Sequence, residues 1–169
     1  YGRVNTEFDR QAFLECSGRF AMALEDVGRI EATLDTELPD FYQQFLLNYP
    51  DKLVSVAKSG ISADGNAFCE GPADLELLNH ADAIIALNER VPVGHWETEW
   101  SPEQFIIGEN GCGDFFTIDL DDEYSSVFFF DHEGSGFDEI AGSLEEFAGD
   151  LILKYTDIRK WAGRRSRQR

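Results

Sequence analysis

The sequence predicts an α+β domain in which helices come first, consecutive strands follow, and one more helix ends the fold. Apolar residues recur at three- and four-residue steps in the first third of the chain, and apolar residues alternate with other residues after residue 104. Helical periodicity returns after residue 143. Helices followed by a run of strands are typical of an α+β fold rather than a doubly wound sheet.

Two helices are expected in the first third of the chain. The apolar stripe of the first consists of Phe20, Leu24, Val27, Ile30 and Leu34, and Gly28 interrupts this helix. The second begins at Pro39, because proline at the first helical position gives up no useful hydrogen bond, and it ends at Pro50.

The middle of the chain is less regular. Glycines and Pro72 predict turns around one or two short strands over residues 51–72. Apolar spacing predicts a third helix over about 73–90, with one side formed by Leu75, Leu78, Ala81 and Ile85. Residues 91–102 contain two prolines and a glycine and should be irregular.

Three strands and a final helix are expected after residue 104. The apolar run 105–107 should end at Gly108, and residues 115–120 alternate with a period of two. Residues 127–130 are apolar at every position, which places that strand centrally in a sheet covered on both faces. Ser143 and Glu146 have the spacing of a capping box, so the last helix should begin there.

Charge is distributed unevenly along the 169 residues. The chain contains 14 Lys and Arg against 33 Asp and Glu, a formal net charge of −19. Residues 154–169 hold seven of the basic residues and one acid, so residues 1–153 carry −25. We expect one domain over 1–160 and a solvated basic tail over 161–169. As alternatives, the basic end neutralises the acidic body or contacts a partner.

The acidic body also limits the partners and the compartment. Contacts to phosphate groups need cations, so general binding to nucleic acid or to an anionic membrane is excluded. No run approaches the ~18 apolar residues of a membrane-spanning helix. The three cysteines are widely spaced and form no C-x-x-C, which favours a reducing compartment and a cytoplasmic location. The chain begins at Tyr1, and removal of a preceding signal peptide stays an alternative.

The segments that resemble phosphate-binding and calcium-binding motifs lack residues that those motifs require. The glycine-rich segment 108–114 lacks the Gly-Lys-Ser/Thr of a phosphate loop and is better interpreted as a tight turn with positive φ at some glycines. Asp119, Asp121 and Glu123 resemble the start of a calcium loop, but Tyr124 and Phe130 occupy positions that require Gly and Glu. An acidic, solvated hairpin loop is expected instead, with weak cation binding as an alternative.

The histidines and cysteines give no better candidate. His80, His95 and His132 have no ligand spacing, and His80 should lie on the polar face of the third helix. Asp131, His132 and Glu133 are consecutive, so their side chains should point to opposite faces and should not share one ion. Glu109 and Asp114 are close to Cys112 in the sequence, and their charge should disfavour a thiolate there, so Cys112 is a poor candidate nucleophile. We therefore expect no catalytic residue, no metal site and no cofactor.

Two segments carry a family resemblance. The first is 30–46, which contains Leu-Pro-Asp-Phe-Tyr at 38–42, and the second runs from the strand at 105–107 through the glycine-rich turn to Phe147. Together they resemble the SUKH superfamily, which includes fungal cell-wall-assembly regulators and many bacterial immunity proteins. The resemblance covers about 30–152, leaving an N-terminal helical extension before it. It implies a mixed, mainly antiparallel twisted β-sheet packed against helices, and no enzymatic activity.

The resemblance and the charge together predict a function. Nuclease toxins are basic because they hold phosphates, so an acidic protein can block the same surface. We predict a non-enzymatic immunity protein that binds and neutralises a cognate toxin, with a basic nuclease-type effector as the candidate. The predicted partner-binding residues are Trp96, Glu97, Glu99, Trp100, Glu109, Asp114, Asp121, Asp122 and Glu123.

Alternatives stay open at this point. Tryptophan is favoured at binding hot spots, but at least one of the two tryptophans is expected to cover the sheet instead. The second functional hypothesis is a regulatory interaction module of the cell-wall-regulator type without a toxin partner. A hydrolase or nucleotide-binding enzyme is a distant third.

Overall fold

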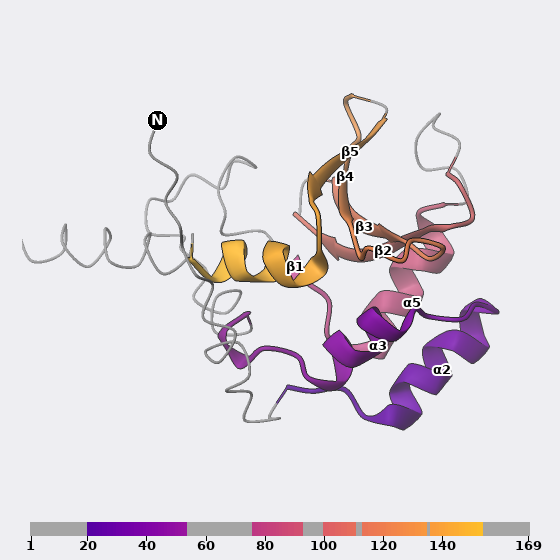
Figure 1. The fold of residues 1–169 in the computed structure, drawn as a ribbon. Helices are drawn as coiled ribbons and strands as arrows, with labels where there is room; N and C mark the ends of the chain where they lie inside the picture. The colour runs from indigo at the N-terminus through magenta and orange to yellow at the C-terminus, as the bar shows by residue number, and fades with distance from the viewer. Residues whose placement is uncertain (1–19, 54–75, 93–99, 111–112, 135, 154–169) are drawn as a thin grey trace, which may run out of the picture.

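The computed structural model describes residues 20–53, 76–92, 100–110, 113–134 and 136–153, in which helices pack against one antiparallel sheet (Figure 1). This arrangement confirms the predicted α+β class. The predicted boundaries at 1–160 and 161–169 lie outside these residues and stay predictions. The elements are α2 (Leu24–Leu34), α3 (Asp40–Leu47), β1 (Glu76–Leu77), α5 (Ala81–Arg90), β2 (Gln104–Glu109), β3 (Phe115–Asp119), β4 (Val127–Asp131), β5 (Gly136–Ala141) and a helix over 144–153.

The sheet has five strands in the order β1-β2-β3-β4-β5, and each neighbouring pair is antiparallel. Its central strand is β3, in which the four residues from Phe115 to Ile118 are all buried. The prediction that 127–130 would be central is therefore wrong by one strand. Strand β4 is an interior strand, paired with β3 and β5, but its Phe128 and Phe129 are only partly buried, so its faces are less well covered than those of β3.

Aromatic side chains cover both faces of the sheet. On one face, Tyr42 from α3 lies 5.8 Å from Phe105 and Phe147 from the final helix lies 4.9 Å from Phe116, measured between ring centroids. On the other face, Trp100 lies 4.8 Å from Phe130. Consecutive residues of a strand point to opposite faces, so the unbroken apolar sequence of β3 matches its burial on both sides.

The first two predicted helices are confirmed with shifted ends. Helix α2 begins only at Leu24, which is 67% exposed, while Val27 and Ile30 are fully buried. Pro39 occupies the N-cap of α3 rather than its first helical position, and the helix ends at Leu47.

The prediction of a helix from about residue 73 is wrong. Residues Glu76 and Leu77 form strand β1, and α5 starts only at Ala81. Leu77 is held in the sheet by pairing with Gly108, and its carbonyl accepts a 2.6 Å hydrogen bond from the Tyr49 hydroxyl. These contacts outweigh the helical apolar spacing. His80 is consequently the extended N-cap of α5, not part of a polar helix face.

Gly108 lies inside a strand rather than ending it. Strand β2 continues to Glu109 through a register shift between Ile106 and Gly108. A Cβ atom at Gly108 would lie 2.5 Å from the carbonyl oxygen of Glu76, so glycine is required where β1 approaches β2. The predicted turn is therefore shorter than 108–114, and Gly113, with φ of 99°, supplies the positive φ expected there.

Strand β5 and the start of the final helix complete the fold. No strand was predicted over 136–141, because this segment is largely exposed and lacks an alternating apolar pattern. It is held by pairing with β4, including Phe130 with Phe137. The Ser143 hydroxyl accepts a 3.1 Å hydrogen bond from the Glu146 N–H, which is one of the two bonds of the predicted capping box. Turns and one or two short strands were predicted over 51–72, but residues 51–53 are helical, and residues 54–72 lie outside the described residues.

Asn88 completes the outer edge of β2 beyond the end of β1. Its Oδ1 accepts a 2.8 Å hydrogen bond from the N–H of Ile106, and its Nδ2 donates a 2.9 Å bond to the carbonyl of the same residue. One side-chain amide thus takes the place of a neighbouring strand and fixes α5 against the sheet.

Replacing Asn88 should test this role. Asn88→Ala leaves a buried strand N–H and C=O without their partner, so we expect the free energy of unfolding to fall by about 2 kcal/mol. Urea denaturation monitored by tryptophan fluorescence measures the change. Glu89→Ala, on the exposed side of the same helix turn, is the matched control. Equal stability of the two variants would contradict the assignment.

Candidate functional site

The sheet separates the predicted partner-binding residues into two groups. We call the end where β2 begins and β3 ends the hairpin end, because the β3–β4 hairpin with Asp121, Asp122 and Glu123 lies there. The opposite end, with Glu109 and Asp114, is the histidine end. The five residue steps of β2 between them span roughly 17 Å. Trp96, Glu97 and Glu99 lie outside the described residues.

Trp100 belongs largely to the aromatic layer of the sheet. Its ring contacts Phe115, Phe130 and Phe137, with centroid distances of 6.2, 4.8 and 5.0 Å. Its Nε1 is buried and has no hydrogen-bond partner among the described residues. The interpretation that at least one tryptophan covers the sheet agrees with this position.

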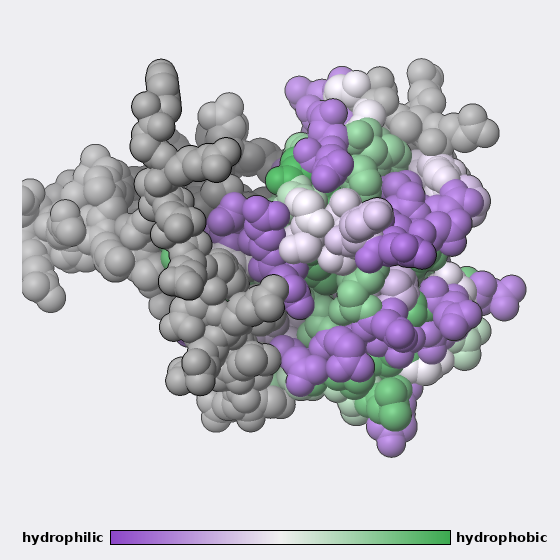
Figure 2. Space-filling view, viewed as in Figure 1, coloured by the Kyte–Doolittle hydropathy of each residue, from purple (hydrophilic) through white to green (hydrophobic). Residues whose placement is uncertain are grey.

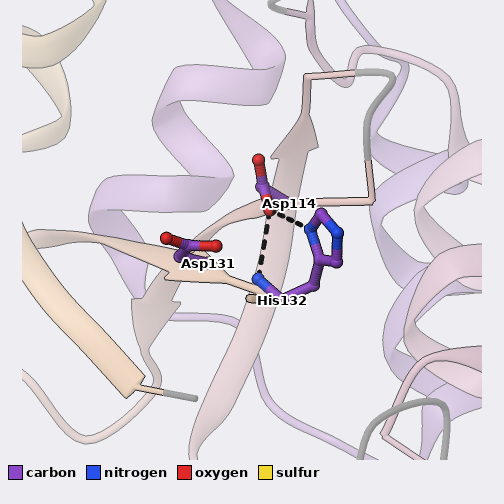
Figure 3. A group of neighbouring side chains, drawn as sticks. All are labelled: Asp114, Asp131 and His132. Atoms are coloured by element: carbon purple, nitrogen blue, oxygen red, sulfur yellow. Dashed lines mark hydrogen bonds and ion pairs between the residues drawn. The ribbon is translucent and has the colours of Figure 1, made fainter. Parts of the chain in front are cut away.

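At the histidine end, Asp114 connects the start of β3 to the end of β4 (Figure 3). One of its carboxylate oxygens, Oδ1, lies 2.6 Å from Nδ1 of His132 and accepts a 3.1 Å bond from the His132 N–H. The other, Oδ2, accepts a 2.6 Å bond from the side chain of Asn110. Asp114 therefore fastens the glycine-rich turn and the β4–β5 turn together.

These bonds shift both pKa values. Partial burial alone would raise the pKa of Asp114, but the hydrogen bonds from His132 and Asn110 outweigh burial and lower it. The hydrogen bond to Asp114 raises the pKa of His132. The ion pair is thus favoured in mildly acidic solution, where the histidine is protonated and the carboxylate is not.

Asp131 joins this pair, against expectation. Potential ligand atoms of Asp114, Asp131 and His132 all lie within 4.8 Å of one another. The argument from opposite strand faces fails because Asp131 is the last residue of β4 and His132 already belongs to the following turn. Within the described residues this is the one such group of three. Its hydrogen bonds give it a structural role that holds two turns together.

At the hairpin end, the acidic residues differ in their hydrogen bonding and exposure. Asp122 accepts hydrogen bonds from the N–H groups of Tyr124 (2.8 Å) and Ser126 (3.1 Å), and the bond from Tyr124 is the largest of the effects that lower its pKa. Asp122 therefore shapes the loop. Asp121 and Glu123 are exposed, and Tyr124 between the strands is 78% exposed. The sequence placed Tyr124 in this loop without predicting that its side chain would be so exposed.

Two adjoining hollows lie between the α2–α3 connection and the hairpin end, and we call them together the α2–α3 groove. The first, about 510 Å³, is lined by nine residues that include the carboxylates of Glu37, Asp40, Glu103 and Asp121. The second, about 260 Å³, is more apolar and includes Leu34, Trp100 and Phe105. Both share Thr36, Pro102 and Leu120. Of the predicted residues, Asp121 and Trp100 line this groove.

Cations are scarce on the described surface, much of which is hydrophilic in the view of Figure 2. The described residues include three Lys or Arg side chains, which are Arg29, Lys52 and Arg90. Arg29 is already paired with Asp26 and Asp82. The sequence contains no Lys or Arg between Arg90 and Lys154, a stretch that includes the whole of β2–β5. This surface is chemically suited to binding a cationic partner.

Comparison with known families gives one match. The sequence model of the SMI1/KNR4 family (SUKH-1) matches residues 22–150, which span every element named above except the last residues of the final helix. A search of curated proteins found no match. None of the described helices has the length and apolar composition needed to cross a membrane.

The Asp114–His132 pair predicts a pH-dependent contribution to stability. Because folding raises the pKa of His132, the protonated histidine stabilises the folded state at low pH, and this contribution is lost as the pH rises through the raised pKa. Folding lowers the pKa of Asp114, so the contribution of its carboxylate is present above the ordinary value of 3.8. The stability difference between wild type and His132→Gln should therefore be largest near pH 5–6 and decline toward pH 9. Denaturant midpoints across this range measure it, with the exposed His80→Gln as control. A difference that does not vary with pH would contradict the ion pair.

Proposed function

Because the chain belongs to the SMI1/KNR4 family (SUKH-1), we propose that it is a non-enzymatic immunity protein that neutralises a basic toxin by covering its active surface. Membership of this family supports a protein of the toxin-immunity or SMI1/KNR4 type. The observation that supports toxin binding is the charge of the segment that forms β2–β5, which contains many acids and no Lys or Arg.

Electrostatics supports this function in two ways. A strongly negative surface accelerates the encounter with a cationic partner and disfavours acidic ones. A nuclease-type toxin holds its substrate through cations that contact phosphates, so a rigid array of carboxylates can occupy the same cations. Neither effect needs a nucleophile, a metal or a cofactor in the immunity protein. Toxin–immunity pairs include some of the tightest complexes known, with dissociation constants on the order of 10⁻¹³ M or lower.

Growth rescue tests this proposal directly. The product of the gene immediately upstream is taken as the candidate toxin domain and is expressed from an inducible promoter, with and without this protein. We expect the protein to restore growth and to form a stable complex with the toxin domain. An unrelated acidic protein of similar net charge serves as the control and should not rescue. Absence of both rescue and complex would contradict the toxin and favour the regulatory module of the cell-wall-regulator type.

The association kinetics should reveal electrostatic steering. We expect the association rate constant with the toxin domain to fall at least about tenfold between 0.05 and 0.5 M salt, while the dissociation rate changes little. Neutralising two exposed hairpin charges with Asp121→Asn and Glu123→Gln should slow association about threefold at low salt and flatten its salt dependence. Stopped-flow fluorescence measures both rates.

Two comparisons make this kinetic test specific. Leu24→Gln changes an exposed side chain without changing charge, so its association rate should equal that of wild type. Asp122 is left intact because its carboxylate organises the loop backbone. Unchanged association by the Asp121→Asn/Glu123→Gln variant would remove the hairpin from the account of steering.

A further inference from the structure

We propose that the α2–α3 groove is a docking site for a segment of the toxin that carries a lysine or arginine next to an apolar side chain. This inference rests on the proposed function and names the part of the surface that makes the contact. The groove joins an acidic hollow to a more apolar one, so it matches a side-chain pair of this kind along one continuous surface.

The acidic hollow collects carboxylates from three separate segments of the chain. Glu37 and Asp40 come from the α2–α3 connection and the start of α3, Glu103 precedes β2, and Asp121 follows β3. Among the described residues that line the two hollows, none is a Lys, Arg or His. A hydrogen bond from the Ser101 hydroxyl lowers the pKa of Glu103, which keeps this carboxylate ionised. The hollow therefore presents negative charge that no described lining residue compensates.

The dimensions and chemistry of this hollow favour a cationic side chain over other ligands. No three of its carboxylates bring oxygens within 4.8 Å of one another, so they do not converge on a single metal ion as the Asp114 group does. Anionic metabolites would be repelled. Pockets for drug-sized molecules measure roughly 300–1,000 Å³ but are predominantly apolar. At about 510 Å³ and with four acids, the hollow instead suits a guanidinium or ammonium group on a long side chain.

The second hollow provides the apolar part of the contact. Leu34, Phe105 and Trp100 line it, and Thr36, Pro102 and Leu120 connect it to the acidic hollow. An apolar side chain of the toxin placed here would bury hydrocarbon while its basic neighbour reaches the carboxylates. The same adjacency favours a mixed contact over a purely electrostatic one, because the described residues that line the second hollow carry no charge.

The walls of the groove are held in place before any partner arrives. The Leu38 N–H donates a 2.9 Å bond to the Glu31 carboxylate, and the Gln43 side chain donates a 2.8 Å bond to the Leu38 carbonyl. Across the groove, the Leu120 N–H donates a 2.8 Å bond to the carbonyl of Glu103. Such fixed walls lower the entropic cost of docking and favour affinity.

Charge reversal in the groove provides the test. In Glu37→Lys/Asp121→Lys, two exposed groove acids become bases, and in the control Glu145→Lys/Asp150→Lys the same change is made on the final helix. The probe is a capped hexapeptide that alternates arginine and leucine, titrated by NMR. We expect the groove variant to bind it at least about tenfold more weakly than the control variant does, a difference of about 1.4 kcal/mol. In wild type, the largest shifts should fall on Thr36, Leu120 and the indole of Trp100.

Two further variants test the position of the peptide and the alternative occupant of the groove. A Thr36→Trp variant fills the junction of the hollows without changing charge and should weaken the same peptide. A variant with Arg164, Arg165, Arg167 and Arg169 changed to Gln tests whether the basic end of this chain occupies the groove instead. Unchanged peptide affinity in that variant supports a toxin segment as the occupant, whereas tighter binding would overturn it. Equal loss in the groove and control variants, or shifts outside the groove, would also overturn the proposal.

Toxin neutralisation separates a failure of this inference from a failure of the proposed function. If wild type and the groove variants all rescue growth equally, the toxin is bound elsewhere and the groove proposal is wrong while the function stands. If wild type binds the peptide in the groove but neutralises no toxin, the function is wrong and the groove binds a cationic segment of a different protein.

Discussion

One apolar core must hold together a surface of mutually repelling carboxylates, and the rest of the structure depends on this constraint. The core succeeds because β3 is buried on both faces, by α3 and the final helix on one side and by Trp100 on the other. Repulsion between like charges is weak in water and acts on exposed side chains, whereas each buried aromatic ring contributes a large apolar area. A fold secured in this way can keep acids at both ends of its sheet without cations beside them.

The two ends of the sheet use their acids differently. At the histidine end, Asp114 is engaged with His132 and Asn110, so it organises two turns. At the hairpin end, Asp122 organises the loop while Asp121 faces the groove. Sequence position alone does not separate these roles, because all three acids lie in turn-like segments between strands. Hydrogen-bond partners do separate them: a carboxylate that accepts backbone N–H groups is less available to a partner than an exposed one.

The sequence predicted those parts of the fold that periodicity and capping encode locally. Strands 105–107 and 115–120 and the helix after Ser143 were found because their apolar patterns and caps lie within a few residues. Strands β1 and β5 were missed, since two residues of β1 and the exposed β5 acquire their structure only by pairing with β2 and β4. Asn88 and the groove were missed for the same physical reason: segments distant in the chain, such as 36–40 and 120–121, meet only after folding. Among the predicted partner-binding residues that the structure describes, Asp121 and Trp100 line that groove.

Purification of the protein from its native cell measures the central claim most directly, which is that this molecule acts by holding a cationic protein. The complex is captured at low salt, washed with increasing salt, and the released proteins are identified by mass spectrometry. The account predicts that a basic protein encoded next to this chain is retained at low salt in a stoichiometric complex. Retention of an acidic protein would contradict the account. So would retention of the adjacent gene's product that does not weaken as the salt concentration rises, because the acids of this chain would then not hold it.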